Sequence, residues 1–328
     1  MEVVILDTGI DRTHPYLKEA ILGGCSVLGK REDYADDNGH GTLCASVIRK
    51  ESPKTRMWVV KVLDRNNETT LENLKKALAL VEKIPVRLVH LSLSILEEMD
   101  DAGIHRMIQR LYESGKLVVC SLENGRSRSC PAVYPEVLGV RGGILESEHS
   151  FWYEEENPIQ CVADSNSYLH ACLQGSYRLF GKNNSFAAAK ITGILASIWE
   201  EDLGLSREEV LERFYELAVR KHYREKDLEQ SLRFPEKTKR TIPEEILKKT
   251  EETVRDFFKV PTTVELENRI LFWKEVGLNK TNSFLLIRRL EEAFSVKIRD
   301  YTGISRYDLC FLKNLAGVMA DELKSESI

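Results

Sequence analysis

The sequence lacks the features that would place it in a membrane or on nucleic acid. A transmembrane helix needs a run of about 18 or more apolar residues, and none occurs among the 328 residues. The formal net charge of −5 provides no basic surface for nucleic acid or acidic lipid. We therefore expect neither nucleic acid nor a membrane among the partners of this protein.

Cysteine is present, but no motif pairs it. The seven cysteines are odd in number and scattered, with no Cys-x-x-Cys pair, which disfavours a disulfide framework and a zinc site. Most lie in apolar runs and are expected to be small buried residues.

The first residues, MEVVILDTGID, lack the basic segment and small-residue cleavage site of a secretory signal. We expect a cytoplasmic protein, and we assign no metal site.

The first half of the chain contains alternating apolar runs and helical patterns. The predicted strands cover residues 3–7, 57–64, 87–94 and 116–122, with helices near 41–50, 71–83 and 98–115. This order predicts an α/β fold with a parallel sheet, in which ligands bind at the carboxyl ends of the strands. Asp7 ends the first strand, Ser92 lies near the end of the third, and Asn124 follows the fourth.

The second half has a different pattern. Residues 185–201 are apolar enough for a buried central helix, and residues 205–219 form an amphipathic pattern opened by a Ser-x-x-Glu capping signal. A strongly charged stretch follows, and beyond it the pattern is helical again. We expect three segments: an α/β domain over residues 1–220, a charged connector over 221–243, and a small all-helical domain over 244–328.

Four polar residues predicted to lie at the carboxyl edge of the sheet, or at helix starts beside it, suggest acyl transfer by serine. That chemistry needs a nucleophile, a base, a carboxylate that orients the base, and donors for the oxyanion. The candidates are Asp7 in LDTGID, His40 in GHGT, Asn124 in LENG and Ser185 in NNSFAAAK. Each has an ordinary alternative role as a capping, buried or turn residue. Their order along the chain, Asp then His then Ser, is that of subtilisin.

In these motifs the first 220 residues resemble the subtilisin-like serine proteases. The matching segments, in the family's order, are LDTGID, GHGTLCAS, LVHLSLS, VVCSLENG with CPAVYPEVLGV, and NNSFAAAKITG. The resemblance implies that Ser185 is the nucleophile and that His40 is the general base and then the acid. It implies that Asp7 fixes the imidazole tautomer and that Asn124 donates to the oxyanion. Other histidines are expected to be structural: His14, His90 and His105.

Several positions depart from the family pattern. Asn183 and Asn184 stand where the family has Gly-Thr before the serine, and Ala189 stands where it has proline. Glu123 and Ser94 replace two glycines that in the family line the pocket for the side chain before the scissile bond. A carboxylate there predicts a preference for a basic side chain, or for a small one if Glu123 fills the pocket. The residues expected to bind substrate are Ser92, Leu93, Ser94 and Glu123.

The helical segment has a resemblance of its own. FWKEVGLNKTNSFLLIRRLEEAFSVKI is similar to the centre of an acyl or peptidyl carrier domain. Lys280 occupies the position of the serine that carries phosphopantetheine, and lysine cannot form that phosphodiester; Ser283 lies three residues further on. The alternative is an ordinary small helical bundle. We expect a carrier-like domain that docks a partner protein and carries no phosphopantetheine.

Together these patterns predict a serine endopeptidase that needs no cofactor. We expect it to process a specific peptide or protein substrate that the helical domain recruits, for example in the maturation of a precursor. A different class of function is a catalytically silent peptide-binding or adaptor protein that retains the fold. A third is an active phosphopantetheine carrier fused to a hydrolase.

Overall fold

The computed structural model describes residues 1–228 and 233–326 and divides into two compact units. The first unit contains Met1–Ser165, Ala171–Gly175 and Gly181–Arg233. The second contains Asn166–His170, Ser176–Phe180 and the chain from Phe234 onward. Part of the expected connector, residues 229–232, lies outside the described residues.

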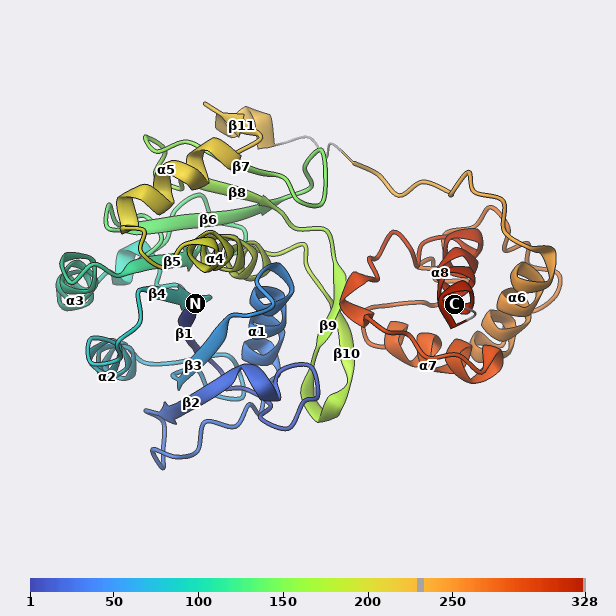
Figure 1. Ribbon diagram of the computed structural model, residues 1–328, viewed down its shortest axis with the longest axis horizontal. Helices are drawn as coiled ribbons and strands as arrows, with labels where there is room; N and C mark the ends of the chain where they lie inside the picture. Colours follow the sequence, from blue (N-terminus) through green and yellow to red (C-terminus); the bar gives the residue numbers. More distant parts are fainter. Residues whose placement is uncertain (229–232, 327–328) are drawn as a thin grey trace. The chain divides into compact units, whose positions relative to one another are not determined.

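A nine-stranded sheet in the order β11-β7-β8-β6-β5-β4-β1-β3-β2 forms the first unit (Figure 1). Its neighbouring strands run parallel except β7 and β8, which are antiparallel. The strands are β1 (Glu2–Asp7), β2 (Ile21–Ser26), β3 (Arg56–Lys61), β4 (Leu88–Leu91), β5 (Leu117–Ser121), β6 (Val137–Gly143), β7 (Phe151–Tyr153), β8 (Cys161–Asp164) and β11 (Arg220–Lys221). The predicted α/β fold with a parallel sheet is confirmed.

Helices cover both faces of this sheet (Figure 1). They are α1 (His40–Glu51), α2 (Leu71–Val81), α3 (Ala102–Glu113), α4 (Asn184–Glu201) and α5 (Arg207–Leu217). The apolar faces of α2 and α3 pack on one side, against alternate strand residues such as Val4 and Val89. Because strand side chains alternate between faces, Asp7 and His90 point to the other side, where α1 and α4 pack.

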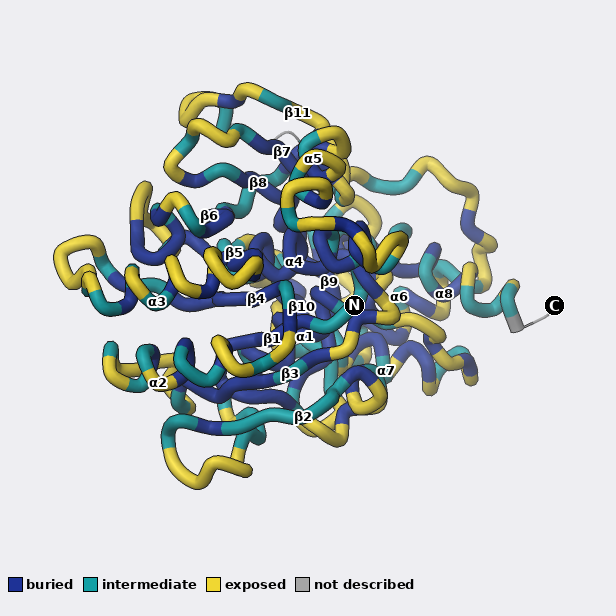
Figure 2. The backbone as a smooth tube through the Cα atoms, turned by 60° about the vertical axis from the view of Figure 1, so that its left-hand side comes forward, coloured by how far each residue is buried: buried dark blue, intermediate teal, exposed yellow. Residues whose placement is uncertain are grey.

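The central helix of the first unit is α4, in which twelve of 18 residues are buried (Figure 2). Its small side chains allow α1 to approach closely. A Cβ atom on Gly193 would lie 2.9 Å from the carbonyl oxygen of Ile48 and 2.6 Å from Cβ of Glu51, both on α1. Glycine at this position therefore sets the distance between the two helices that carry the candidate base and nucleophile.

The second unit combines helices with a β-hairpin from an earlier part of the chain. The helices are α6 (Glu244–Phe258), α7 (Ser283–Phe294) and α8 (Leu312–Glu326), and the hairpin strands are β9 (Tyr168–Ala171) and β10 (Tyr177–Phe180). Leu169 and Leu179 of the hairpin share one apolar core with residues of all three helices, such as Val254, Leu286 and Leu315. This core thus extends beyond the all-helical segment expected over 244–328, because a short strand pattern does not reveal its packing partner.

The start of the charged connector packs on the first unit. Tyr223 is buried, and its hydroxyl donates a hydrogen bond of 2.6 Å to the carbonyl oxygen of Ile159. Arg233 forms an ion pair with the fully buried carboxylate of Asp164 at 3.0 Å.

Short 3₁₀ turns occur at Lys18–Ala20, Glu97–Met99, Leu173–Gly175, Glu225–Leu228 and Tyr301–Gly303. Within the described chain, every helix is too short or too polar to cross a membrane.

Leu169→Ala tests whether the hairpin completes the second unit. Leu169 is fully buried in the helical core, and deletion of such a side chain typically costs about 2–5 kcal/mol. Hydrogen exchange should show loss of amide protection in α7 and α8. The control is Leu285→Ala on α7, whose side chain is 57% exposed. Unchanged protection of both helices in Leu169→Ala would contradict the shared core.

Candidate functional site

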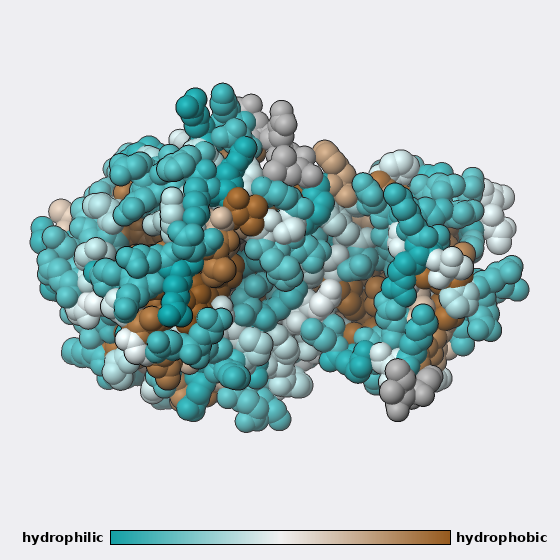
Figure 3. Space-filling model, turned by 45° about the horizontal axis from the view of Figure 1, so that its top comes forward, coloured by the Kyte–Doolittle hydropathy of each residue, from teal (hydrophilic) through white to brown (hydrophobic). Residues whose placement is uncertain are grey.

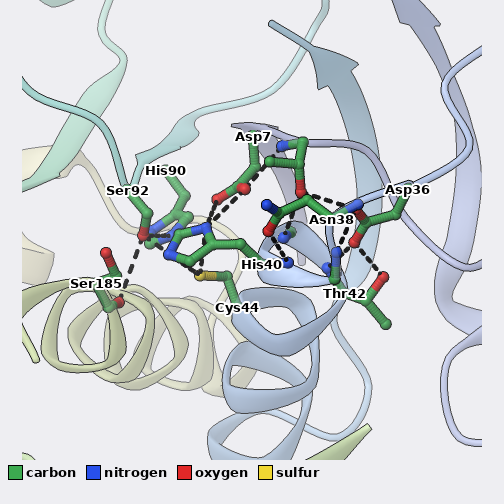
Figure 4. A network of polar contacts seen from close by, with 12 residues as sticks. Asp7, Asp36, Asn38, His40, Thr42, Cys44, His90, Ser92 and Ser185 are labelled. Carbon is green, nitrogen blue, oxygen red and sulfur yellow. Dashed lines mark hydrogen bonds and ion pairs between the residues drawn. The ribbon is translucent and has the colours of Figure 1, made fainter. Parts of the chain in front are cut away.

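Asp7 and His40 form a direct pair at the carboxyl edge of the sheet. Asp7 is the last residue of β1, and His40 is the first residue of α1. Nδ1 of His40 lies 2.8 and 3.0 Å from the two carboxylate oxygens of Asp7 (Figure 4). Asp7 is fully buried, and its carboxylate also accepts a hydrogen bond of 2.7 Å from the backbone N–H of Thr8. The predicted orienting residue and base are thus brought together.

Asp36 holds the loops that carry this pair. One of its carboxylate oxygens accepts hydrogen bonds from the Thr8 hydroxyl (2.9 Å) and the Gly39 amide (2.7 Å). The other accepts from the amide and the hydroxyl of Thr42 (2.9 and 2.6 Å). Gly41 permits the close approach of the loops, since a Cβ atom there would lie 2.2 Å from the Gly9 carbonyl oxygen. The loop geometry therefore fixes the position of the imidazole.

The Asp7 carboxylate determines the protonation of His40. Burial lowers the pKa of His40, but attraction to the adjacent carboxylate outweighs burial and raises this pKa well above 6.5. Cys44, one turn further along α1, places its sulfur 3.9 and 4.0 Å from the two ring nitrogens. Burial raises the pKa of Cys44, so that its side chain is a neutral thiol. The ring thus lies between a carboxylate and an uncharged sulfur.

Ser185 lies in the first turn of α4. The N-cap of this helix is Asn183, whose side-chain oxygen accepts a hydrogen bond of 2.8 Å from the amide of Phe186. The first turn leaves the Ser185 amide without an intrahelical acceptor. Ser92 Oγ lies 3.4 Å from the Ser185 carbonyl oxygen. Figure 4 shows the edge of the His40 ring opposite to Asp7 turned toward Ser92 and Ser185.

Asn184 links the start of α4 to the sheet and to Asn124. Its side-chain nitrogen, Nδ2, donates a hydrogen bond to the carbonyl oxygen of Leu122, just after β5 (2.9 Å). Its side-chain oxygen accepts a hydrogen bond from the backbone N–H of Gly142 in β6 (2.9 Å). Its backbone N–H donates to the side-chain oxygen of Asn124 at 3.1 Å. The NH₂ group of Asn124, which is exposed, stays available as a donor beside Ser185.

A cavity of about 430 Å³ lies at these residues. All four residues expected to bind substrate line it, together with Asn124 and Ser185; they are Ser92, Leu93, Ser94 and Glu123. The Glu123 carboxylate accepts a hydrogen bond from the Ser94 hydroxyl. Glu68 is a second carboxylate in the lining, which contains no lysine or arginine from the described part of the chain. The lining thus carries two carboxylates and no basic side chain from the described residues to offset them.

A model of the subtilase family matches residues 1–233 of the sequence. The chain belongs to the subtilase family. The match ends before α6, so the helices of the second unit lie beyond it.

Individual subtilases and a solved structure agree with this assignment. The chain is 30% identical over 230 residues to the major intracellular serine protease of Bacillus subtilis (strain 168), covering 62% of this chain and 70% of that protein. It is 27% identical over 218 residues to an intracellular serine protease of Paenibacillus polymyxa, covering 60% and 66%. A cold-adapted subtilisin-like serine proteinase of known structure has 18% identity and a TM-score of 0.56, covering 66% of this chain and 81% of that one. The last comparison shows a shared fold.

Another cavity of this subtilase, larger than the one at Ser185, contains none of the predicted site residues. Its volume is about 1180 Å³, and seven glutamates line it together with residues such as Ser197 and Ile198 near the C-terminal end of α4. Figure 3, in which the side bearing α5 is turned forward, shows a hydrophobic strip between hydrophilic ridges on this unit. Cavity size alone would therefore mislead; the site is recognised by its donors, acceptors and buried charge.

The sequence patterns did not single out every residue that shapes the site. Asp36 accepts a hydrogen bond from the Thr8 hydroxyl, 28 positions earlier in the chain, and Asn184 accepts one from the backbone N–H of Gly142, 42 positions earlier. An available signal for Asp36 is its position two residues before Asn38, the spacing of an Asx turn, in which the Asp side chain accepts from that backbone N–H. Donor atoms of Asp7, His40 and Cys44 lie within 4.8 Å of one another, a group able to hold a metal ion. However, His40 Nδ1 and the Asp7 carboxylate are already hydrogen-bonded to one another, and we assign no metal.

The pKa of His40 can be measured through the NMR titration of its ring. We expect a value above 6.5 and a lower value in Asp7→Asn, which removes the attraction that raises the pKa. Because the folded-state pKa is raised, the ion pair stabilises the fold below the unfolded value, and this stabilisation is lost as pH rises through the folded pKa. A ring that titrates at or below 6.5 in the wild type would contradict this account.

Proposed function

We propose that this subtilase is a serine endopeptidase that hydrolyses peptide bonds through an acyl-enzyme at Ser185. The observation that carries the proposal is the pair formed by the fully buried Asp7 and His40, whose ring is turned toward Ser185 in the first turn of α4 (Figure 4). Serine proteases among the relatives support the same reaction class. A peptide or protein is the substrate, and none of the steps requires a cofactor.

The reaction follows from the order of these groups. Ser185 Oγ attacks the scissile carbonyl carbon and transfers its proton to Nε2 of His40, because Nδ1 is engaged by Asp7. The Asn124 amide and the Ser185 backbone N–H donate to the oxyanion that forms. His40 then protonates the leaving amine as the C–N bond breaks, and water hydrolyses the resulting ester by the reverse sequence.

The active-site cavity suggests the side chain that precedes the scissile bond. Glu123 and Glu68 supply carboxylates to a site without lining lysine or arginine among the described residues. The bond from Ser94 orients the Glu123 carboxylate, and a partly desolvated carboxylate attracts a cation more strongly than an exposed one. We propose a preference for arginine or lysine at this position of the substrate.

The second unit would recruit the substrate or a partner protein. Its described residues expose three large apolar side chains, Phe234 at 69%, Trp273 at 52% and Leu285 at 57%, of the kind that anchors protein contacts. Phosphopantetheine is not part of the proposal, because Lys280 occupies the attachment position and Ser283 is fully buried. Cytoplasmic processing of a specific precursor would fit both the recruiting unit and the relatives that are named intracellular proteases.

Ser185→Ala tests the catalytic proposal. The variant should lose labelling by a serine-directed fluorophosphonate and lose peptide cleavage by roughly 10³-fold or more. Its fold should persist, because the change removes only one hydroxyl from a helix start. The control is Ser197→Ala on the same helix, whose hydroxyl bonds only to the carbonyl of Ile194 among the described contacts. A wild-type protein that neither labels nor cleaves would instead favour a silent peptide-binding adaptor.

Glu123→Gln tests specificity. Removal of the charge should lower kcat/KM for peptides with arginine or lysine before the scissile bond by about 10-fold or more, and leave alanine-containing peptides nearly unchanged. Glu155→Gln, a change at an exposed glutamate outside the active-site cavity, is the control. Dominant cleavage after phenylalanine or leucine by the wild type would refute the proposed preference.

A further inference from the structure

His90 is a fully buried histidine in β4 whose two ring nitrogens both have partners. Nδ1 lies 2.8 Å from Oγ1 of Thr192 on α4, and Nε2 lies 2.6 Å from Oγ of Ser92. Figure 4 shows the ring of His90 beside Ser92, next to His40. The reaction described above assigns His90 no task, and the sequence pattern predicted only a structural role.

The neighbouring hydrogen bonds determine the direction of these contacts. The hydroxyl of Thr192 donates to the carbonyl oxygen of Ala188 at 2.8 Å, so it accepts the proton of Nδ1. The other nitrogen, Nε2, is then the acceptor for the hydroxyl of Ser92. Only a neutral imidazole offers one donor and one acceptor. Burial lowers the pKa of His90 to about 4, which supports the neutral form.

This ring connects β4 with the two helices that carry His40 and Ser185. Ser92 Oγ lies 3.5 Å from the Cys44 sulfur, which packs under the His40 ring on α1. The same oxygen lies 3.4 Å from the carbonyl oxygen of Ser185. Thr192 follows Ser185 by seven residues, about two turns along the same face of α4. His90 thus bonds to α4 directly and, through Ser92, contacts Cys44 on α1 and the first turn of α4.

We propose that His90 is a positioning residue for the nucleophile. Its neutral ring, fixed in the Nδ1–H tautomer, sets the rotation and axial position of α4 on β4 and thereby the approach of Ser185 to His40. The inference rests on the proposed peptidase function. A displacement of about 1 Å at a reacting atom can cost roughly 10²-fold in rate, so a small shift of α4 would be measurable.

Two variants of His90 test the hydrogen bonds of its two ring nitrogens separately. The amide of asparagine takes the place of Nδ1, so His90→Asn keeps a partner for Thr192 and loses the acceptor for Ser92. The amide of glutamine takes the place of Nε2, so His90→Gln does the reverse. Thr192→Val removes the acceptor from α4, and Thr192→Ser restores it. Thr250→Val is the matched control, because Thr250 is buried and makes the same bond to a carbonyl four residues earlier, in α6.

The experiment measures kcat, KM and the rate constant for fluorophosphonate labelling on the full-length chain. We expect His90→Asn, His90→Gln and Thr192→Val to lower kcat and the labelling rate by about 10- to 100-fold, with KM within about twofold of wild type. Thr192→Ser should recover most of the loss, and Thr250→Val should show none. The effects of His90→Gln and Thr192→Val should not add in the double variant, since both break the same contact.

The outcomes that overturn the proposal are distinct. Folded His90 and Thr192 variants that keep wild-type kcat and labelling, and lose only thermal stability, would make His90 a space-filling core residue. If the His90 variants do not fold, the Thr192→Val and Thr192→Ser pair decides by the same criterion. A wild-type protein without labelling or turnover would refute the peptidase function itself, and the role of His90 with it.

Discussion

The buried carboxylate of Asp7 is the constraint on which the rest of the site depends. A charge without solvent is costly unless hydrogen bonds and an opposite charge compensate it. Here the compensation comes from the Thr8 amide and from the ring of His40. The Thr8 amide and the His40 ring must stay in place for the fold to tolerate the buried carboxylate. The hydrogen bonds of Asp36 and the close approach of Gly41 to Gly9 hold the loops that carry them. The same arrangement that makes the carboxylate tolerable also gives the imidazole a defined tautomer.

The parts of this site that follow from local chemistry could be predicted from the sequence. Asp7 and Asn124 follow apolar strand runs, and parallel strands bring their carboxyl ends to one edge. Contacts between residues far apart in the chain could not be predicted in this way. His90 meets Thr192 across 102 positions, and Asn184 meets Gly142 across 42. No spacing rule encodes such pairs. They depend on how closely α4 packs on the sheet, which the small buried side chains of α4 allow.

The hairpin of the second unit illustrates the same limit. Its residues lie within the segment 1–220 predicted to form the α/β domain, yet Leu169 and Leu179 pack with α6, α7 and α8. An alternating pattern shows that one face of a strand is buried but not against which partner. The consequence concerns the whole chain: β10 ends at Phe180, and the nucleophile position follows five residues later. The second unit is therefore built partly from the segment that leads into α4, the helix that carries Ser185.

The most direct test of the account is to trap the acyl-enzyme. The protein would be mixed with an activated ester of a short arginine-containing peptide, quenched in acid within the first turnover, and digested for mass spectrometry. We expect one acyl group per chain, located on Ser185 in the segment NNSFAAAK. An acyl group on Cys44 or on another residue, or turnover with no covalent intermediate, would contradict it.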